Sequence, residues 1–410
     1  MPFVRSWTTD NLAELELAFA RLGLPRSARD YLSEKLPHRT LLLTDLSDVE
    51  RRFLKSRADL SSAPGYEAYP AFIAGDGRTR PGSALLFGRT EQHDRLVAEA
   101  EAEPELRGLA TALRRVLESL TPPEQFEVGG RSYHRAQAPY LMAVVNVTPD
   151  SFSDGGHYFS TEGAVAHGVA LAEAGAHFLD VGGESSRPGA EPVSADEELS
   201  RVVPVIRALR ERTGLPISID TVKPEVAREA LGVGASWVND ITGFANPAMA
   251  RVTAEANGSC CLMHMQGTPR TMQAAPRYQD CVAEVVAFLE GAVGRAEAAG
   301  IPRGRILVDP GIGCGKTLGH NLFLLRRLGD LRGLGLPILV GTSRKTFLGK
   351  LTGRVEAKDR LFATLGSLAS MAALGGADVV RVHDVAEARD ALTVAAAIRS
   401  AADGGDAFGG

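Results

Sequence analysis

The sequence lacks the features that mark secreted, zinc-stapled and membrane-spanning proteins. Only four cysteines occur in 410 residues, and their irregular spacing matches neither a disulfide framework nor a zinc site: Cys260, Cys261, Cys281 and Cys314. No apolar run approaches the roughly 20 residues that cross a bilayer. The first residues do not combine a charged stretch with an apolar core, so no signal peptide is expected. These absences predict a reduced, cytoplasmic setting.

A strong excess of charge of one sign is also missing. The net charge is −5, so no global basic field points to nucleic acid as a partner. The apolar fraction of 44% and the charged fraction of 23% are ordinary for a globular protein. The length is too great for one average domain and suits a barrel of about 250 residues with an extension.

The N-terminal region carries little recognisable chemistry. We predict that residues 1–122 form a separate α+β extension, ending at Thr121-Pro122-Pro123, before a domain at 123–403. Short strands are expected at 39–44 and 83–87. Helices are expected from Thr8 to Leu22, from a Ser47 cap to about Leu60, and over 91–120. Three arginines near an apolar strand form either an anion site or, as we favour, a solvated surface: Arg78, Arg80 and Arg89.

Strand-like and helical segments alternate after a short hairpin at residues 127–132, whose Gly-Gly pair suits a tight turn. That hairpin could plug the bottom of a barrel. Strands are expected at 141–146, 177–182, 216–220, 236–240, 259–264, 305–309, 337–341 and 377–382. Helices are expected between them, for example at 162–174, 197–213, 224–233 and 280–299. This alternation predicts a (β/α)8 TIM barrel. A doubly wound open sheet is the competing fold, but no Gly-x-Gly-x-x-Gly fingerprint opens the first helix.

Every predicted barrel strand ends in polar or charged residues. Barrel enzymes react at this end of their strands, so the pattern indicates one site built from all eight loops. One set of side chains suits the edge of a nitrogen heterocycle: Asp220, Asn239 and Asp309. A second set suits a phosphate or pyrophosphate: Ser186, Arg187, Arg344, Lys345, Arg381 and His383.

Two other motifs have weaker functional interpretations. Residues 313–317, Gly-Cys-Gly-Lys-Thr, resemble the end of a nucleotide-binding loop, but Pro310 stands where that loop needs glycine. His264 could suggest a metal, yet it has no partners at ligand spacing, so local packing or hydrogen bonding is the favoured interpretation.

The strand-end motifs, taken in order, resemble those of the dihydropteroate synthase family. The resemblance covers residues 138 to about 400 and is carried by 146–156, 180–189, 219–221, 239–240, 263–273, 309–317, 343–345 and 381–384. The stretch Thr148–Gly156 and the triplet Ser343–Lys345 distinguish synthases from other pterin-binding barrels. Members of the family, which are sulfonamide targets and usually dimers, condense 6-hydroxymethyl-7,8-dihydropterin diphosphate with 4-aminobenzoate in folate biosynthesis.

The resemblance implies a role for each matching residue. Catalysis would involve Asp220, Asp309, Lys345, Arg381 and His383. The pterin would contact Asp220, Asn239, Ile241, Met263, Asp309, Gly341 and Lys345. The diphosphate would contact Asn146, Ser186, Arg187, Arg381, Val382 and His383, with Asn146 also helping to hold Mg2+. The aminobenzoate would contact Phe152, Pro188, Cys314, Ser343 and Lys345. Loops 146–156 and 182–190 would close over the substrates.

The sequence departs from the family pattern in three places. Ser186 stands where the family usually has Thr, Cys314 stands where it usually has Phe, and residues 1–122 have no counterpart in the minimal synthase. Two other functions compete. A folate-dependent methyltransferase barrel would need no diphosphate site, and a degenerate pterin-binding paralogue would not keep so complete a set of strand-end residues. We therefore expect a transferase that acts on small-molecule substrates.

Overall fold

The computed structural model describes residues 39–43, 45–61, 69–74, 84–119, 123–148, 161–185 and 190–400. The chain divides into two compact units, Met1–Leu120 and Thr121–Gly410. Within the described residues, no helix is long and apolar enough to cross a membrane. The helix predicted from Thr8 to Leu22, and the arginines Arg78 and Arg80, lie outside the described residues.

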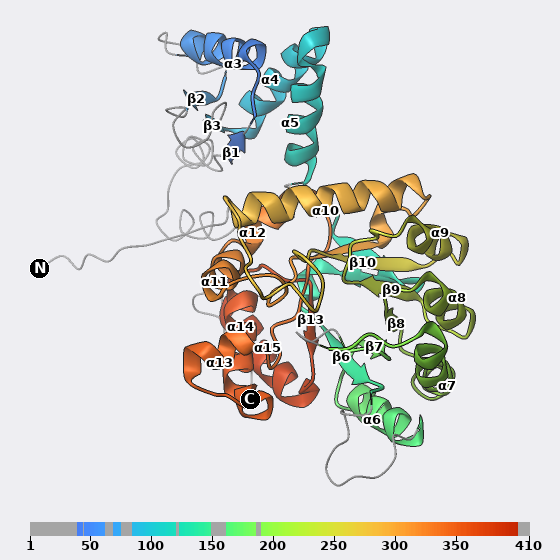
Figure 1. The fold of residues 1–410 in the computed structure, drawn as a ribbon. Coiled ribbons are helices and arrows are strands. Elements are labelled where there is room, and N and C mark those ends of the chain that lie inside the picture. Colours follow the sequence, from blue (N-terminus) through green and yellow to red (C-terminus); the bar gives the residue numbers. More distant parts are fainter. Residues whose placement is uncertain are drawn as a thin grey trace, which may run out of the picture. The chain divides into compact units, whose positions relative to one another are not determined.

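The first unit is a small α+β structure, drawn in blue to cyan in Figure 1. Its antiparallel strands lie in the order β1-β3-β2, with β1 at Arg39–Leu43, β2 at Ala71–Ala74 and β3 at Ala84–Gly88. Its helices are α3 (Asp48–Ser61), α4 (Thr90–Ala102), η1 (Pro104–Leu106) and α5 (Arg107–Ser119). The predicted Ser47 cap is confirmed, because the Glu50 amide donates to Ser47 Oγ over 3.3 Å. The helical stretch predicted over 91–120 is interrupted at Pro104, which has no amide proton to continue α4.

The second unit is a (β/α)8 barrel, as the sequence predicted. Its strands are β6 (Tyr140–Asn146), β7 (Phe178–Gly182), β8 (Ile217–Asp220), β9 (Trp237–Asp240), β10 (Ser259–Met263), β11 (Ile306–Asp309), β12 (Leu339–Val340) and β13 (Val379–Val382). They pair in parallel in the order β11-β10-β9-β8-β7-β6-β13-β12. A parallel bridge between Val308 and Ile338 joins the two end strands and closes the barrel.

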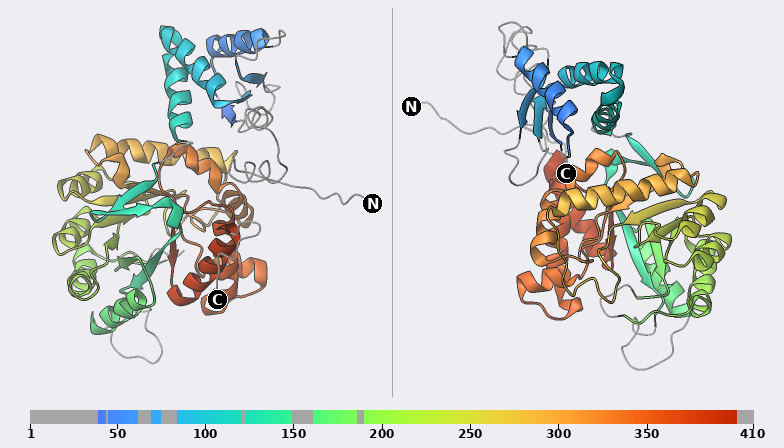
Figure 2. Two further views of the ribbon diagram at one scale, coloured as in Figure 1. Left: turned by 180° about the vertical axis from the view of Figure 1, so that it is seen from behind. Right: turned by 45° about the horizontal axis from the view of Figure 1, so that its top comes forward.

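Helices surround the strands on the outside (Figures 1 and 2). They are α6 (Thr161–Glu173), α7 (Ala195–Thr213), α8 (Pro224–Gly232), α9 (Pro247–Glu255), α10 (Cys281–Ala298), α11 (Leu318–Arg326), α12 (Leu328–Leu331), α13 (Thr346–Thr352), α14 (Leu361–Ala373) and α15 (Val385–Ser400). Strands β7, β9, β10 and β11 are buried along their whole length, because helices cover one face and barrel side chains fill the other. This two-sided burial explains the continuous apolar runs seen in the sequence.

The predicted hairpin closes the amino-terminal end of the barrel. Its strands are β4 (Gln125–Val128) and β5 (Arg131–His134), and both glycines of its turn have positive φ, 59° at Gly129 and 72° at Gly130. Phe126 and Val128 form a core cluster with residues near the strand starts, including Phe178 and Trp237. The plug is therefore confirmed, and the opposite end of the barrel remains available for a site.

Candidate active site

The structure gathers most of the predicted site residues at the carboxyl ends of the barrel strands. Strands β6, β8, β10 and β11 end at Asn146, Asp220, Met263 and Asp309. The other described members of the set lie in, or directly after, the neighbouring strands: Asn239, Ile241, Cys314, Gly341, Ser343, Lys345, Arg381, Val382 and His383. Four of the predicted residues lie outside the described residues: Phe152, Ser186, Arg187 and Pro188.

Arg381 is at the centre of an ionic network inside the barrel mouth. Its Nε donates to Asp180 Oδ2 over 2.6 Å, and its Nη2 donates to Asp220 Oδ2 over 2.9 Å. Asn239 Nδ2 donates to the same Asp180 oxygen over 3.2 Å. The side chain of Asp180 is completely buried. Arg381, which the sequence assigned to the diphosphate subsite, thus contacts Asp220 of the predicted pterin subsite and Asp180, which the sequence assigned to neither.

Burial dominates the electrostatics of this network. It raises the pKa of Asp220 from its ordinary value of 3.8 to about 7, against the opposing attraction of Arg381. It also raises the pKa of Asp309, although Lys345 and the Gly311 amide favour the ionised form. The pKa of Arg381 is raised because the nearby carboxylates outweigh its own desolvation. Several carboxylates share one guanidinium here, so the pocket favours a ligand that brings additional N–H donors.

Lys345 joins the ends of β11 and β12. Its ammonium donates to the Ile312 carbonyl, in the loop that begins at Asp309. Asp309 Oδ1 in turn accepts from the Gly311 amide over 2.7 Å. A Cβ placed on Gly341 would lie 3.8 Å from Lys345 Nζ and 3.6 Å from Arg381 Cβ. These contacts bring Asp309, Gly341, Lys345 and Arg381 to one side of the mouth.

The loops after β12 and β13 hold each other through two further pairs. Ser343 Oγ and His383 Nδ1 lie 2.9 Å apart, and the His383 amide donates to the same hydroxyl over 3.2 Å. Arg344 Nε donates to Asp384 Oδ2 over 3.0 Å. Arg344, which the sequence grouped with the anion-binding residues, is therefore committed to a carboxylate, whereas Ser343 and His383 remain neighbours at the mouth.

Asn146 offers a single neutral oxygen at the end of β6, where it is half-buried and pairs in register with Gly182. Within the described residues, no three His, Cys, Asp or Glu side chains form a metal-binding group. Mg2+ usually takes one or two protein ligands and completes its shell with water and substrate phosphates. The donor set therefore fits a Mg2+ ion that arrives with a diphosphate.

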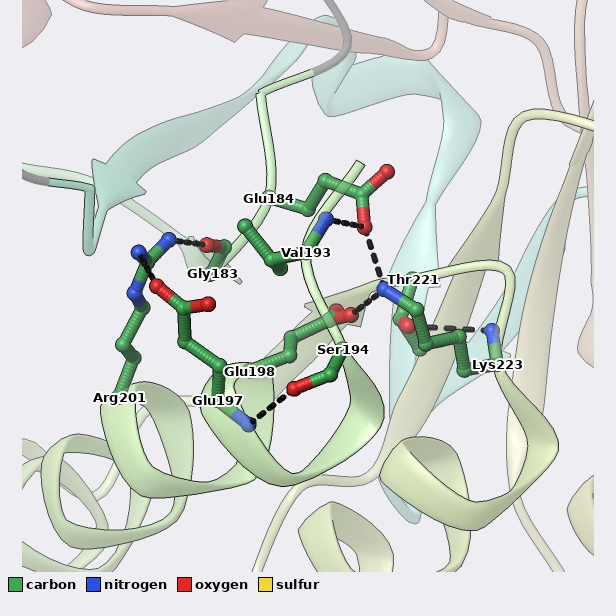
Figure 3. Close-up of polar contacts among 9 residues, drawn as sticks. All are labelled: Gly183, Glu184, Val193, Ser194, Glu197, Glu198, Arg201, Thr221 and Lys223. Atoms are coloured by element: carbon green, nitrogen blue, oxygen red, sulfur yellow. Dashed lines mark hydrogen bonds and ion pairs between the residues drawn. The ribbon is translucent and has the colours of Figure 1, made fainter. Parts of the chain in front are cut away.

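A cluster beside this site was not predicted from the sequence. Lys223 Nζ contacts carboxylate oxygens of Glu184 and Glu198, and Figure 3 shows the lysine between the two acids. Glu184 also accepts from the Val193 amide over 3.4 Å, and Arg201 Nη1 donates to the Gly183 carbonyl over 2.7 Å. These bonds hold the backbone on both sides of residues 186–189. No motif in the sequence marks Glu198 or Lys223.

Comparisons with known proteins agree with this arrangement. Residues 142–383 match the model of a family described as pterin binding enzyme. Dihydropteroate synthase of Escherichia coli strain K12 is 48% identical over 263 residues, which are 64% of this chain and 93% of that protein.

Two solved structures of Xanthomonas albilineans dihydropteroate synthase are also similar. The complex with 4-aminobenzoic acid has a TM-score of 0.64 and 46% identity, covering 68% of this chain and 99% of the other. The complex with 7,8-dihydropteroate has a TM-score of 0.61 and 43% identity, covering 68% of this chain and 100% of the other. The chain belongs to the pterin-binding enzyme family, and within it to the dihydropteroate synthases.

Proposed function

We propose that this chain condenses 6-hydroxymethyl-7,8-dihydropterin diphosphate with 4-aminobenzoate, releasing 7,8-dihydropteroate and pyrophosphate in folate biosynthesis. The observation that carries the proposal is the ionic network of the buried Asp180 with the partly buried Asp220 and Arg381 at the mouth of the barrel. The solved structures named above support it, since dihydropteroate synthase of Xanthomonas albilineans is in complex with 4-aminobenzoic acid in one and with 7,8-dihydropteroate in the other. The enzyme is a transferase.

The pterin lies against the acidic side of the mouth. Asp220 and Asp309 accept N–H groups from the ring edge, and Asn239 can both donate and accept. Lys345 donates to an acceptor on the ring, Met263 and Ile241 pack on its faces, and Gly341 leaves space beside Lys345. Support for these roles comes from the burial of Asp309 and Asn239, which are each 5% exposed and thus positioned for a ligand that replaces water.

The diphosphate lies at the rim, beside the strand ends of β6 and β13. Arg381 and His383, with the Val382 backbone, provide N–H donors, and Ser186 and Arg187 complete this subsite. Asn146 would hold Mg2+ together with the diphosphate oxygens. When bound, the ion would neutralise charge on the leaving group.

Bond breaking precedes attack by the arylamine. Carbon–oxygen cleavage leaves a cation delocalised over the electron-rich dihydropterin, and Asp220 and Asp309, in their ionised form, stabilise it through the weakly polar barrel interior. Arg381 and His383 stabilise the departing diphosphate. The amine of 4-aminobenzoate is neutral at pH 7, so the chain needs no dedicated base to activate it. Its nitrogen bonds to the cationic carbon, and the arylammonium so formed gives its proton to the released pyrophosphate. Ser343 and Lys345, with Phe152, Pro188 and Cys314, line the pocket that holds this second substrate.

Loops 146–156 and 182–190 are also proposed to close over the bound substrates, although residues 149–156 and 186–189 lie outside the described residues. A closed site excludes water, which would otherwise trap the cation. The contacts of Glu184 and Arg201 support this proposal, because they hold the described backbone at the base of the second loop.

Direct assay tests the reaction. The purified chain, supplied with the pterin diphosphate, 4-aminobenzoate and Mg2+, should release pyrophosphate in proportion to dihydropteroate formed. Omitting the aminobenzoate separates synthesis from hydrolysis of the diphosphate. A folded protein that releases none, but binds a methylated folate, would favour the methyltransferase alternative.

We also propose that the chain acts as a homodimer in the cytoplasm. Large apolar side chains stay exposed along α14, α15 and the segment before them: Val355 (81%), Phe362 (83%), Leu374 (64%), Val394 (60%) and Ile398 (73%). Exposed apolar area of this kind commonly marks an interface, and a second copy would cover it. Light scattering should give twice the chain mass, and Phe362→Asp should shift it to the monomer. A wild-type monomer would contradict the proposed dimer.

A further inference from the structure

The proposed reaction gives no role to His264 and uses only Cys314 of the Gly-Cys-Gly-Lys-Thr stretch at 313–317. The structure brings them together. Lys316 Nζ lies 2.9 Å from His264 Nδ1, and the two residues are only 3% and 5% exposed. A lysine so deeply buried is unusual and needs a reason.

The ammonium of Lys316 donates hydrogen bonds to several backbone carbonyls. It donates to Gly311 O over 3.0 Å and to Cys314 O over 2.9 Å, and His264 O lies 3.4 Å away. Together with His264 Nδ1, these make four acceptors for three ammonium protons, so every proton of the ammonium has a partner. Burial and Lys316 lower the pKa of His264 to about 3, so its ring is neutral and Nδ1 is free to accept. In the part of the chain that the structure describes, no carboxylate forms a salt bridge with Lys316.

The loop from Gly311 to Gly315 is held along its whole length by side chains. Lys316 binds its first and fourth carbonyls. The second, Ile312 O, accepts from Lys345. The third, Gly313 O, accepts from Gln273 Nε2 over 2.6 Å, and the fifth, Gly315 O, accepts from the Tyr278 hydroxyl over 2.7 Å. Each of five successive carbonyls therefore has a side-chain donor, and Lys316 is the donor that serves two of them.

This loop also lies directly on the segment after β10. A Cβ on Gly311 would stand 1.9 Å from the His264 carbonyl oxygen, and one on Gly315 would stand 2.5 Å from the Gln266 carbonyl oxygen. Both glycines have positive φ, 67° and 62°. Two stretches of backbone are thus in contact, and their carbonyl oxygens converge on a single cation.

We propose that Lys316 is a positioning residue that fixes the arylamine side of the active site. It sets the backbone of Cys314 directly, and it sets the Ile312 carbonyl that holds Lys345. Asp309, Asn239 and Asp220 lie on strands β8, β9 and β11, whose pairing does not require Lys316. Cys314 contacts only the aminobenzoate in the proposed site, whereas Lys345 contacts both substrates, so the effect falls on the aminobenzoate more than on the pterin. This assignment rests on the proposed function.

The test separates the two substrates. Lys316→Met keeps the length of the side chain and removes the ammonium, while Lys350→Met removes an exposed lysine of the same unit as a control. We expect Lys316→Met to raise the KM for aminobenzoate by about tenfold to a hundredfold, the scale of a misplaced contact. Binding of 6-hydroxymethylpterin, measured by calorimetry without turnover, should stay near the wild-type value. The control should match wild type in both measurements.

Milder variants keep the test valid if Lys316→Met does not fold. Lys316→Gln retains an amide that can donate to two carbonyls, and His264→Asn retains an oxygen that can accept from Lys316. Both should give intermediate KM values for aminobenzoate. Equal losses for the two substrates, or an unchanged KM for aminobenzoate in folded Lys316→Met, would overturn the proposal.

Hydrogen exchange gives a readout that needs no catalysis. The amides of residues 311–315 should exchange faster in Lys316→Met than in Lys350→Met, and unchanged exchange would count against the proposed role. A wild-type chain that releases no pyrophosphate would instead refute the proposed function, and the exchange rates would still decide whether Lys316 holds the loop.

Discussion

Arg381 links two parts of the proposed reaction through a single side chain. Its guanidinium contacts Asp180 and Asp220, yet the diphosphate subsite is proposed to use it as well. The sequence predicted the residue types at the strand ends, because their polarity breaks the apolar runs. It did not predict this pairing, since Asp180 and Arg381 are 201 positions apart and no local pattern relates them.

Asp220→Asn should change how stability depends on pH. Burial raises the pKa of Asp220 from 3.8 to about 7, so the folded state keeps a proton that the unfolded state releases. This contribution is fully present below about pH 4 and is lost as the pH rises through about 7. We expect wild type to lose stability relative to Asp220→Asn between about pH 4 and about pH 7. Urea unfolding of both proteins across this pH range gives their free energies of unfolding. A difference between the two that does not change with pH would contradict the prediction.

Cys314→Phe should tighten the arylamine pocket. The partly exposed Cys314 stands where the family usually has Phe, and a smaller side chain leaves the pocket looser. Filling such space with apolar atoms typically improves binding by about tenfold or more. We expect lower KM for aminobenzoate and lower inhibition constants for sulfonamides in the variant. Steady-state inhibition of both proteins by one sulfonamide measures this. Equal inhibition constants for wild type and variant would contradict the prediction.

At the scale of the elements, the barrel strands were predictable to within about two residues. Buried parallel strands are continuous apolar runs, and each ends where polar loop residues begin. The predicted strand at 337–341 is shorter in the structure, because Pro337 has no amide proton for the ladder and only Leu339–Val340 pair as a strand. Strand β2 was missed, since its four residues are too few to give a clear periodic signal.

Lys223→Met should destabilise the barrel. Lys223 compensates Glu198, which is 1% exposed. Glu198 Oε2 contacts Lys223 Nζ, and Oε1 has no hydrogen-bond partner among the described residues. Removing one partner of a buried ion pair costs about 3–5 kcal/mol. We expect a loss of that order in the free energy of unfolding, measured by denaturant titration against Lys350→Met. The double variant Lys223→Met/Glu198→Leu should regain much of the lost free energy of unfolding, because it no longer buries an unpaired carboxylate. A Lys223→Met protein as stable as wild type would refute this account.

At the scale of the whole molecule, the two units differ in how far sequence predicts their function. The barrel combines a fold with motifs in fixed order, whereas the first unit has a small α+β core without recognisable chemistry. The apolar core of the first unit shows only that it packs as a folded domain. Many different functions use such cores, so the core does not identify the function of this unit. The boundary at residue 122 and the role of the extension remain predictions.

A chain without residues 1–122 should keep its activity. The Escherichia coli relative is matched over 93% of its length by 64% of this chain, so the matched segment corresponds to nearly a whole enzyme. We expect residues 123–410 to release pyrophosphate at a rate close to that of the full chain. Parallel assays of the two proteins at equal concentration measure this. If the shortened chain folds but is inactive, the extension is needed for catalysis.

The contact between the Gly311–Gly315 loop and the segment after β10 has a consequence for inhibitor resistance. Side chains cannot be added at Gly311 or Gly315 without moving the backbone of His264 or Gln266. Ile312 and Cys314 face no such limit, because they already carry side chains. Gly313, the third glycine of the loop, also has positive φ (82°), and a Cβ there would lie 2.9 Å from Lys345 Cδ. Heritable change in this loop is therefore confined to alternate positions, and selection with a competitor of aminobenzoate should recover substitutions at 312 and 314 while leaving the three glycines unchanged.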